Sequence, residues 1–337
     1  MTDTIPRKFK AFRIHDDSDG YRSGIEDIAL EQLNSGDVTV KVLWSSINYK
    51  DALAATGKGR ILRRFPLCGG IDLAGIVVQS SAESFSEGDE VIVTGTGLSE
   101  LRDGGYAEYQ RVDSRSVVPL PDGLSLRDTM ALGTAGFTAA LSLYRMEALG
   151  QSPDMGPVVV TGATGGVGSI AINILHVAGY DVHAITGKVD EFDYLESLGA
   201  TQCISRKELY WGQKPLETTR WAGCIDNVGD DMLSGITRVI HPFGNIASCG
   251  LAGGTALQTT VMPFILRGVS LIGISSSNCP YPLRGQIWQR LASDWKPDRL
   301  EDIARNEVAM DDMEETFAGM MRGEALGRTI VRVRSEE

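Results

Sequence analysis

The sequence predicts an α/β protein in which a doubly wound parallel sheet follows a β-barrel-like domain. Short strand-like runs and turns fill the chain up to Ser125, and from Leu126 strands alternate with amphipathic helices. The buried strand Val158–Val160 also leads through a glycine-rich turn into a helix, as in a dinucleotide-binding domain. We therefore expect a nucleotide-binding Rossmann domain at 130–280 and a catalytic domain formed by 1–129 and 281–337.

The first domain is expected to be β-rich because its apolar residues alternate with polar ones. Asp37–Val42 shows this alternation, and Gly88-Asp89 is a typical turn. After the helical segment that begins at Pro282, Arg328–Val333 predicts a terminal strand that returns to this domain. The other expected strands of this domain are Ile76–Val78, Glu90–Val93 and Ser116–Val118.

The second domain contains the six strands that two βαβαβ halves require. They are expected at Val158–Val160, Val182–Ile185, Gln202–Ser205, Ala222–Val228, Asn245–Gly250 and Ser270–Ile274.

Composition limits the compartment and the partners. The net charge of -12 argues against a nucleic acid or an anionic membrane surface as a partner. No apolar run is long enough to span a membrane, and Met1–Lys10 lacks the apolar core of a signal peptide. Five scattered cysteines without a C-x-x-C pair indicate reduced thiols. These features predict a cytoplasmic protein.

The glycine-rich turn predicts a pyrophosphate site. Its pattern, Ala163-x-Gly165-x-x-Gly168, is a variant of G-x-G-x-x-G. Gly165 and Gly166 leave room for phosphates near the start of the helix, and Gly168 lets the helix pack closely on the strand. The alternative is a structural turn without a ligand.

The residues after the second and third strands favour NADP(H). An NAD site usually has an acidic residue at the end of the second strand, whereas this chain has Thr186, Gly187 and Lys188. An acidic residue there would repel the 2′-phosphate that distinguishes NADP(H) from NAD(H). Arg206 follows the neighbouring third strand and can reach the 2′-phosphate as well. The alternative is that Lys188 and Arg206 are ordinary surface cations.

The order of the two domains resembles the medium-chain dehydrogenase/reductases, whose catalytic domain is a GroES-like β-barrel. Zinc enzymes of that superfamily carry a G-H-E segment, but the matching stretch here has Ile71 at the position of the ligand. No cysteine lies in 45–51, and no four-cysteine lobe is present. We therefore expect no metal. Without a Lewis acid, reduction of a C=C bond conjugated to a carbonyl is easier than reduction of a ketone, because hydrogen-bond donors can stabilise the enolate.

Further segments in both domains resemble the acrylyl-CoA reductase and quinone oxidoreductase family within that superfamily. The resemblance implies reduction of acryloyl-CoA to propanoyl-CoA with NADPH. Two positions depart from the family pattern: Cys68-Gly69-Gly70 replaces x-P-G, and Lys188 replaces an arginine. The segments are 44–53, 56–59, 64–66, 133–139, 249–254 and 262–267. The cofactor contacts implied by the resemblance are Tyr49, Thr164, Gly165, Gly166, Val167, Thr186, Gly187, Lys188, Arg206, Leu251, Ile265 and Ser276.

Tyr49 is the candidate catalytic residue. Its phenol can hold the ribose or the substrate, or donate the α-proton, although a phenol with a pKa of roughly 10 is a slow acid. Asn48 beside it is interpreted as a structural turn residue. Asp51 and Asp72 are either acids of the cleft or partners in salt bridges of the loop, and we favour the second interpretation.

Four cations lie close together in the segment that follows Tyr49, at Lys58, Arg60, Arg63 and Arg64. Arg63 and Arg64 are interpreted as steering the phosphates of CoA against the negative field of the protein. The alternative is a solvated loop without a ligand.

Two other functions remain open at this point. One is an NADPH-dependent quinone or general activated-alkene reductase, and the other is an NADPH-binding regulatory protein without turnover. The strand expected at 269–275 can pair at a sheet edge, as in relatives, which predicts a homodimer.

Overall fold

The computed structural model describes residues 5–334, which form two compact units. The first unit contains the chain up to Thr134, Ser277–Gln286 and the chain from Ala304 onward, and the second contains Ala135–Ser276 and Ile287–Ile303. The chain thus enters the second unit twice.

Ile287–Ile303 belongs to the second unit because its aromatic side chains are buried there. Trp288 packs against Phe137 with ring centroids 6.2 Å apart. Asn173 donates from Nδ2 to the Asp298 carboxylate at 2.8 Å. We expected all of 281–337 in the first domain, whereas the structure groups Ile287–Ile303 with the second unit.

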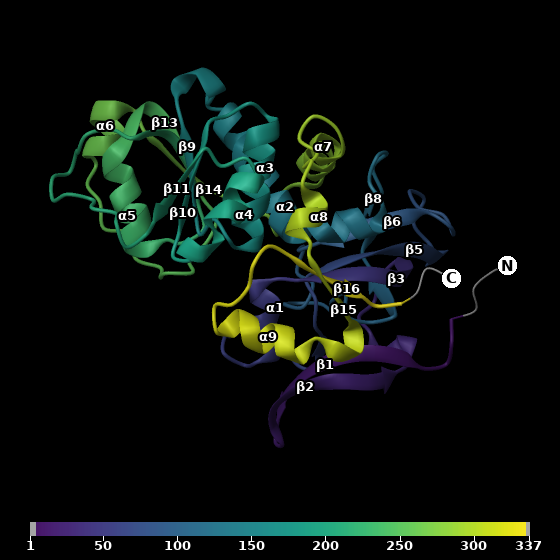
Figure 1. Cartoon of the computed structure of the whole chain (residues 1–337). Helices are drawn as coiled ribbons and strands as arrows, with labels where there is room; N and C mark the ends of the chain where they lie inside the picture. Colours follow the sequence, from purple (N-terminus) through teal and green to yellow (C-terminus); the bar gives the residue numbers. More distant parts are fainter. Residues whose placement is uncertain (1–4, 335–337) are drawn as a thin grey trace. The chain divides into compact units, whose positions relative to one another are not determined.

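A six-stranded parallel sheet forms the second unit, in the order β11-β10-β9-β12-β13-β14. From β9 the chain moves to β10 on one side, and from β12 it moves to β13 on the other. The connecting helices α3 (Gly166–Val177) and α5 (Asp230–Val239) cover opposite faces of the sheet (Figure 1), as right-handed crossovers require. The predicted doubly wound sheet is confirmed. Its strands are β9 (Val158–Thr161), β10 (Val182–Thr186), β11 (Gln202–Ser205), β12 (Trp221–Asp226), β13 (Ile240–Ser248) and β14 (Ser270–Gly273).

Two sheets form the first unit, and β3 is the strand around which the larger one is built. The larger sheet has the order β15-β16-β3-β5-β6-β8, with β7 also paired to β3, and the smaller has the order β2-β1-β4. The C-terminal strand β16 pairs antiparallel with β3, so the chain returns to this unit as expected. The strands are β1 (Phe9–Asp17), β2 (Gly20–Ile28), β3 (Val38–Ile47), β4 (Leu67–Cys68), β5 (Asp72–Ser80), β6 (Glu90–Thr94), β7 (Tyr109–Val112), β8 (Val118–Pro119), β15 (Asn306–Ala309) and β16 (Thr329–Arg332).

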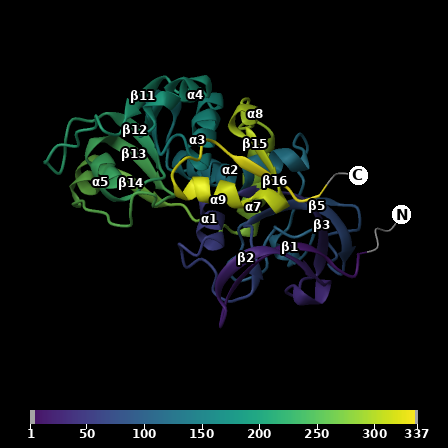
Figure 2. The same ribbon diagram turned by 60° about the horizontal axis from the view of Figure 1, so that its bottom comes forward.

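A short helix, α1, follows the end of β3 and packs beside α9 (Figure 2). Within residues 5–334, no helix is long and apolar enough to cross a membrane. The helices are α1 (Tyr49–Ala55), α2 (Leu126–Glu147), α3 (Gly166–Val177), α4 (Phe192–Ser197), α5 (Asp230–Val239), α6 (Met262–Arg267), α7 (Tyr281–Ala292), α8 (Leu300–Ile303) and α9 (Glu314–Met321).

Candidate active site

The glycine-rich turn connects β9 to α3 at the carboxyl edge of the parallel sheet. Gly162 turns the chain with φ +59°, and the surface is reached at Gly165, Gly166 and Val167. Gly165 is the N-cap of α3 and brings no side chain to it. The first N–H groups of a helix have no acceptor within the helix, so this turn presents backbone donors for an anion.

Gly168 is needed for packing inside the turn. A Cβ on Gly168 would lie 2.4 Å from the carbonyl oxygen of Gly162 and 2.8 Å from Cα of Ala163. A Cβ on Gly165 would meet only the Gly162 oxygen, at 3.3 Å. The two glycines therefore serve different purposes: Gly168 closes the turn, and Gly165 keeps its outer side open.

The predicted 2′-phosphate corner is assembled from β10 and β11. The backbone N–H of Arg206 donates to the carbonyl of Thr186 at 2.8 Å, and a Cβ on Gly187 would lie 2.7 Å from Nε of Arg206. The Lys188 N–H donates to the Thr186 hydroxyl at 3.1 Å, and that hydroxyl lies 3.4 Å from the hydroxyl of Thr164. These contacts bring the predicted corner together with Thr164 of the glycine-rich turn. The Arg206 side chain is exposed at these strand ends, and an exposed guanidinium there suits a phosphate.

Asp226 lies at the end of β12, in the middle of the carboxyl edge of the sheet, and accepts hydrogen bonds from neighbouring segments. Its buried carboxylate accepts hydrogen bonds from the Thr161 hydroxyl at 2.6 Å and the Gly229 N–H at 2.9 Å. Burial raises the pKa of Asp226, and these hydrogen bonds oppose the rise. Asn227 then donates to the Thr161 carbonyl at 2.8 Å, which ties the ends of β9 and β12 together.

The remaining predicted cofactor residues fall at different places in the unit. Leu251 is 61 % exposed on a loop where the Gly253 N–H donates to the Val228 carbonyl, so the loop lies over the end of β12. Ser276 follows β14 at the same carboxyl edge. Ile265 lies in α6, whose last residue Arg267 donates to the carbonyl of Ile240, the first residue of β13. The contact of Ile265 with the cofactor stays a prediction.

In the first unit, Tyr49 is the first residue of α1. Its side chain is 48 % exposed and makes no hydrogen bond with any described residue of that unit. Lys50 beside it pairs with Glu100 at 2.6 Å. Tyr49 is thus accessible.

Behind Tyr49 lies a buried polar cluster that the sequence did not predict. The Asp72 carboxylate accepts from the Ser46 hydroxyl at 2.7 Å, from Asn48 Nδ2 at 2.8 Å and from the Thr134 N–H at 3.0 Å. Both Asp72 and Asp51 are buried, with exposures of 0 % and 2 %. Neither is a surface salt-bridge partner, so our preferred interpretation of these two acids is wrong.

Arg328 supplies the positive charge of this cluster. Its guanidinium donates to the Ser46 hydroxyl at 2.7 Å, to the Ile47 carbonyl at 3.0 Å and to Asn48 Oδ1 at 3.1 Å. Burial lowers the pKa of Arg328, while Asp72 and Asp51 act in the opposite direction. A Cβ on Gly133 would lie 2.7–2.8 Å from side-chain atoms of three members of the cluster, which explains the glycine there.

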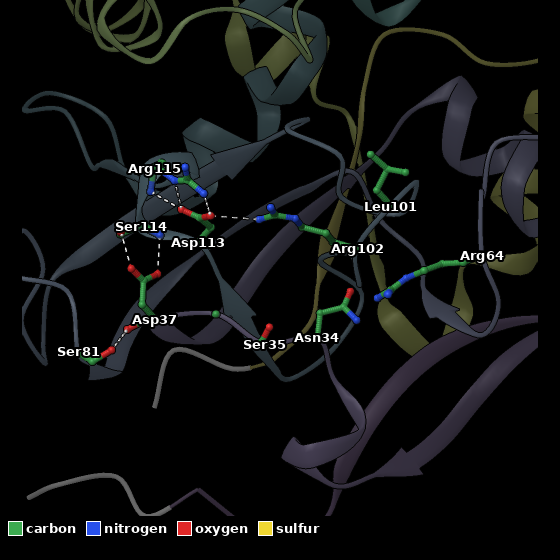
Figure 3. A pocket seen from close by; sticks show the side chains of 11 residues that line it. Asn34, Ser35, Asp37, Arg64, Ser81, Leu101, Arg102, Asp113, Ser114 and Arg115 are labelled. Carbon is green, nitrogen blue, oxygen red and sulfur yellow. Dashed lines mark hydrogen bonds and ion pairs between the residues drawn. The ribbon is translucent and has the colours of Figure 1, made fainter.

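The basic loop has two kinds of surroundings. The side chain of Arg63 is exposed, and its backbone N–H donates to the backbone carbonyl of Glu100 at 2.9 Å. The side chain of Arg64 lines a polar cavity of about 690 Å³ that extends to Asp37, just before β3 begins (Figure 3). In that cavity Asp113 already pairs with Arg115 at 2.6 Å and with Arg102 at 3.7 Å.

Ile71 lies between the two buried acids and donates its backbone N–H to Asp51 at 3.0 Å. Within residues 5–334, no three His, Cys, Asp or Glu side chains gather where they could hold a metal ion. The absence of a catalytic metal stays a prediction.

Comparison with known proteins identifies the family. Residues 34–122 match the family model for the alcohol dehydrogenase GroES-like domain, and residues 166–293 match the model described as zinc-binding dehydrogenase. The chain is 45 % identical to a protein of Bacillus subtilis named "Putative quinone oxidoreductase YhfP", over 96 % of this chain and 99 % of that one. It is 44 % identical to the acrylyl-CoA reductase AcuI of Ruegeria pomeroyi, over 93 % and 94 %. The chain belongs to the medium-chain dehydrogenase/reductase family.

Solved structures of family members agree with the fold. The yhdH oxidoreductase of Salmonella enterica in complex with NADP matches with a TM-score of 0.93 and 44 % identity, over 96 % of this chain and all of that chain. The yhfP protein of B. subtilis with NAD bound also matches with a TM-score of 0.93, over 97 % and 100 %. The expected GroES-like and Rossmann architecture, and the closer resemblance to acrylyl-CoA reductases and quinone oxidoreductases, are confirmed.

One signal for the cluster behind Tyr49 was present in the sequence. Asn48 followed by Asp51 has the spacing of an N-cap residue and its N3 partner. The participation of Asp72, Thr134 and Arg328 has no local signal, because these residues come from three other segments.

Proposed function

We propose that this protein is an NADPH-dependent reductase of acryloyl-CoA. The observation that carries the proposal is 44 % identity to an acrylyl-CoA reductase over nearly the whole chain, together with a carboxyl edge suited to NADP(H). The glycine-rich turn, Thr186, Lys188 and Arg206 supply donors for the phosphates of the cofactor. Bound NADPH supplies a hydride.

The reaction adds that hydride to the β-carbon of the thioester and a proton to the α-carbon. Between these steps negative charge lies on the carbonyl oxygen, which needs hydrogen-bond donors. Tyr49 holds the substrate or the nicotinamide ribose through its phenol, and the α-proton comes from solvent or from that phenol. We favour solvent, because a phenol is a weak acid near neutral pH.

Activity with three substrates tests this proposal. NADPH oxidation is measured side by side with acryloyl-CoA, crotonyl-CoA and a quinone. We expect the highest kcat/KM with acryloyl-CoA. A preference for the quinone would establish the second candidate function, which the similarity to YhfP favours. Tight NADPH binding without turnover of any of them would establish a regulatory protein.

We further propose that Arg63 and Arg64 attract the phosphates of CoA. Both are exposed, and neither forms an ion pair with another described residue of the first unit. Replacing both by alanine should raise KM for acryloyl-CoA several-fold at low salt and less at high salt, because salt screens exposed charges. A short acryloyl thioester without CoA phosphates is the control. An equal loss with both substrates would contradict the steering role.

A homodimer that forms through β14 completes the proposal. β14 is an edge strand of the six-stranded sheet, and apolar side chains are exposed on and near it, including Leu271 and Leu266. An unpaired edge of this kind readily pairs with a second copy. Light scattering should give twice the mass of 36.3 kDa, and Leu271→Lys should shift it toward the monomer. We place the protein in the cytoplasm, which agrees with five free cysteines.

A further inference from the structure

The first turn of α1 is held by hydrogen bonds that take no part in the proposed reaction. Asp51 accepts the Asn48 backbone N–H at 2.9 Å on one carboxylate oxygen and the Ile71 N–H at 3.0 Å on the other. Asp51 therefore connects the first turn of α1 to its N-cap residue Asn48 and also to the segment before β5.

Asn48 extends this anchor into the buried cluster. Its Nδ2 donates to Asp51 at 3.1 Å and to Asp72 at 2.8 Å, while its Oδ1 accepts from Arg328 at 3.1 Å. Every hydrogen-bonding atom of this side chain is engaged. The residue directly before Tyr49 is thus fixed to three charged side chains from three segments.

Tyr49 has no comparable support of its own. Its phenol makes no hydrogen bond with a described residue of the first unit, and α1 has only seven residues. A helix this short has little intrinsic stability. The direction of Tyr49 must then follow the backbone at its N-terminus, which Asn48 and Asp51 hold.

We propose that Asp51, acting with Asn48, is a positioning residue for Tyr49. This inference rests on the proposed role of Tyr49 in the reaction. Asp51 touches neither substrate nor cofactor in this scheme; its carboxylate sets the first turn of α1, and the turn sets the phenol. Asp72 and Arg328 hold the other side of Asn48.

A double-mutant cycle tests the proposal. Asp51→Asn keeps the size of the side chain but loses one acceptor oxygen. We expect it to lower kcat about as much as Tyr49→Phe does, on the order of fivefold. In the Tyr49→Phe background, Asp51→Asn should change kcat by less than about twofold, because the two changes remove the same contribution. An undiminished loss in that background would overturn the proposal, and so would an unchanged kcat in Tyr49→Phe.

The matched control is Asp128→Asn. Asp128 accepts the Ser125 N–H at 3.1 Å and so plays the same capping role at the start of α2. We expect this variant to lose some stability but to keep kcat. If Asp51→Asn does not fold, Asn48→Ser replaces it in the cycle, because serine is a good N-cap residue but lacks the amide that contacts Asp72 and Arg328.

A second readout does not depend on turnover. The nine tyrosines are replaced by 3-fluorotyrosine, and the ¹⁹F resonance of Tyr49 is assigned by its loss in Tyr49→Phe. Asp51→Asn should shift or broaden this resonance, whereas Asp128→Asn should not. An unmoved resonance would overturn the positioning role. If the wild-type protein does not reduce acryloyl-CoA, the proposed function fails, but the resonance still decides whether Asp51 orients Tyr49.

Discussion

The two candidate sites of this protein are built in opposite ways. The carboxyl edge of the second unit is made of backbone, with a turn that Gly162 and Gly168 close tightly and that Gly165 keeps open on its outer side. The region behind Tyr49 is made of buried side chains, where Asn48 donates to both Asp51 and Asp72 and accepts a hydrogen bond from Arg328. A backbone site depends on the absence of side chains, whereas a side-chain cluster depends on mutual charge and hydrogen bonding. Substitutions should therefore disturb the two sites in different ways.

The largest expected effect is on the pH dependence of stability and comes from Asp51. Burial and the neighbouring Asp72 raise its pKa from 3.8 to about 7, against the N–H groups that donate to it. Between these pH values the folded state binds more protons, so the free energy of unfolding falls as pH rises from 4 to 7. At about 1.4 kcal/mol per pKa unit, the loss is on the order of 4 kcal/mol.

Urea unfolding at pH 5 and pH 8 measures this effect. The difference in unfolding free energy between wild type and Asp51→Asn should change with pH in favour of the variant at pH 8. The other titratable groups around Asp51, namely Asp72, Tyr106 and Arg328, are the same in both proteins. If the difference in unfolding free energy between the two proteins is the same at pH 5 and pH 8, Asp51 is ionised at both pH values and its pKa is not raised.

The contrast between the two sites also explains what the sequence could predict. The strand, turn and helix around Gly165 form one continuous segment, so their pattern was visible and the doubly wound sheet followed from it. The pairing of Thr186 with Arg206 followed from strand order, because β10 and β11 are neighbours. In these cases the information is local or is fixed by topology.

The cluster behind Tyr49 was not predictable because its members meet only in the folded chain. Asp72 begins β5, Thr134 lies in α2 after the break at Gly133, and Arg328 precedes β16. A lone aspartate on a strand is more often exposed, which led to the wrong interpretation of Asp51 and Asp72 as loop salt-bridge partners. The cofactor contact of Ile265, which is exposed on α6, comes from the family resemblance alone and stays a prediction.

Glycine substitutions sharpen the comparison within the backbone site. Gly168→Ala places a Cβ 2.4 Å from a backbone oxygen that cannot move away cheaply, so the turn must open. We expect at least a hundredfold weaker NADPH binding by fluorescence titration, with a destabilisation of about 1–3 kcal/mol. Gly165→Ala meets only one atom at 3.3 Å and should weaken NADPH binding with little loss of stability. Equal destabilisation by both variants would contradict the division of roles.

Cofactor selectivity is a smaller effect at the same edge. We expect NADPH to bind at least tenfold more tightly than NADH, or about 1.4 kcal/mol, through Thr186, Lys188 and Arg206. Lys188→Ala should weaken the binding of NADPH and leave the binding of NADH unchanged. Lys214→Ala is the control, because Lys214 is a cation outside the strand ends. The structure of yhfP with NAD bound shows that a relative can hold the cofactor without the 2′-phosphate. Equal affinities for the two cofactors would overturn the NADP(H) assignment.

The smallest expected effect is that of metal removal, which should be none. In the zinc enzymes of the superfamily the metal polarises a carbonyl, and a histidine ligand stands where this chain has Ile71. The Ile71 side chain has no donor atom, and the neighbouring Asp51 and Asp72 oxygens are already engaged by N–H and O–H donors. A metal would have to displace those donors, including the Asn48 amide that holds the start of α1. Exhaustive chelation should therefore leave the rate of acryloyl-CoA reduction unchanged, and elemental analysis should find no stoichiometric zinc. One zinc per chain, lost together with activity, would overturn the metal-free mechanism.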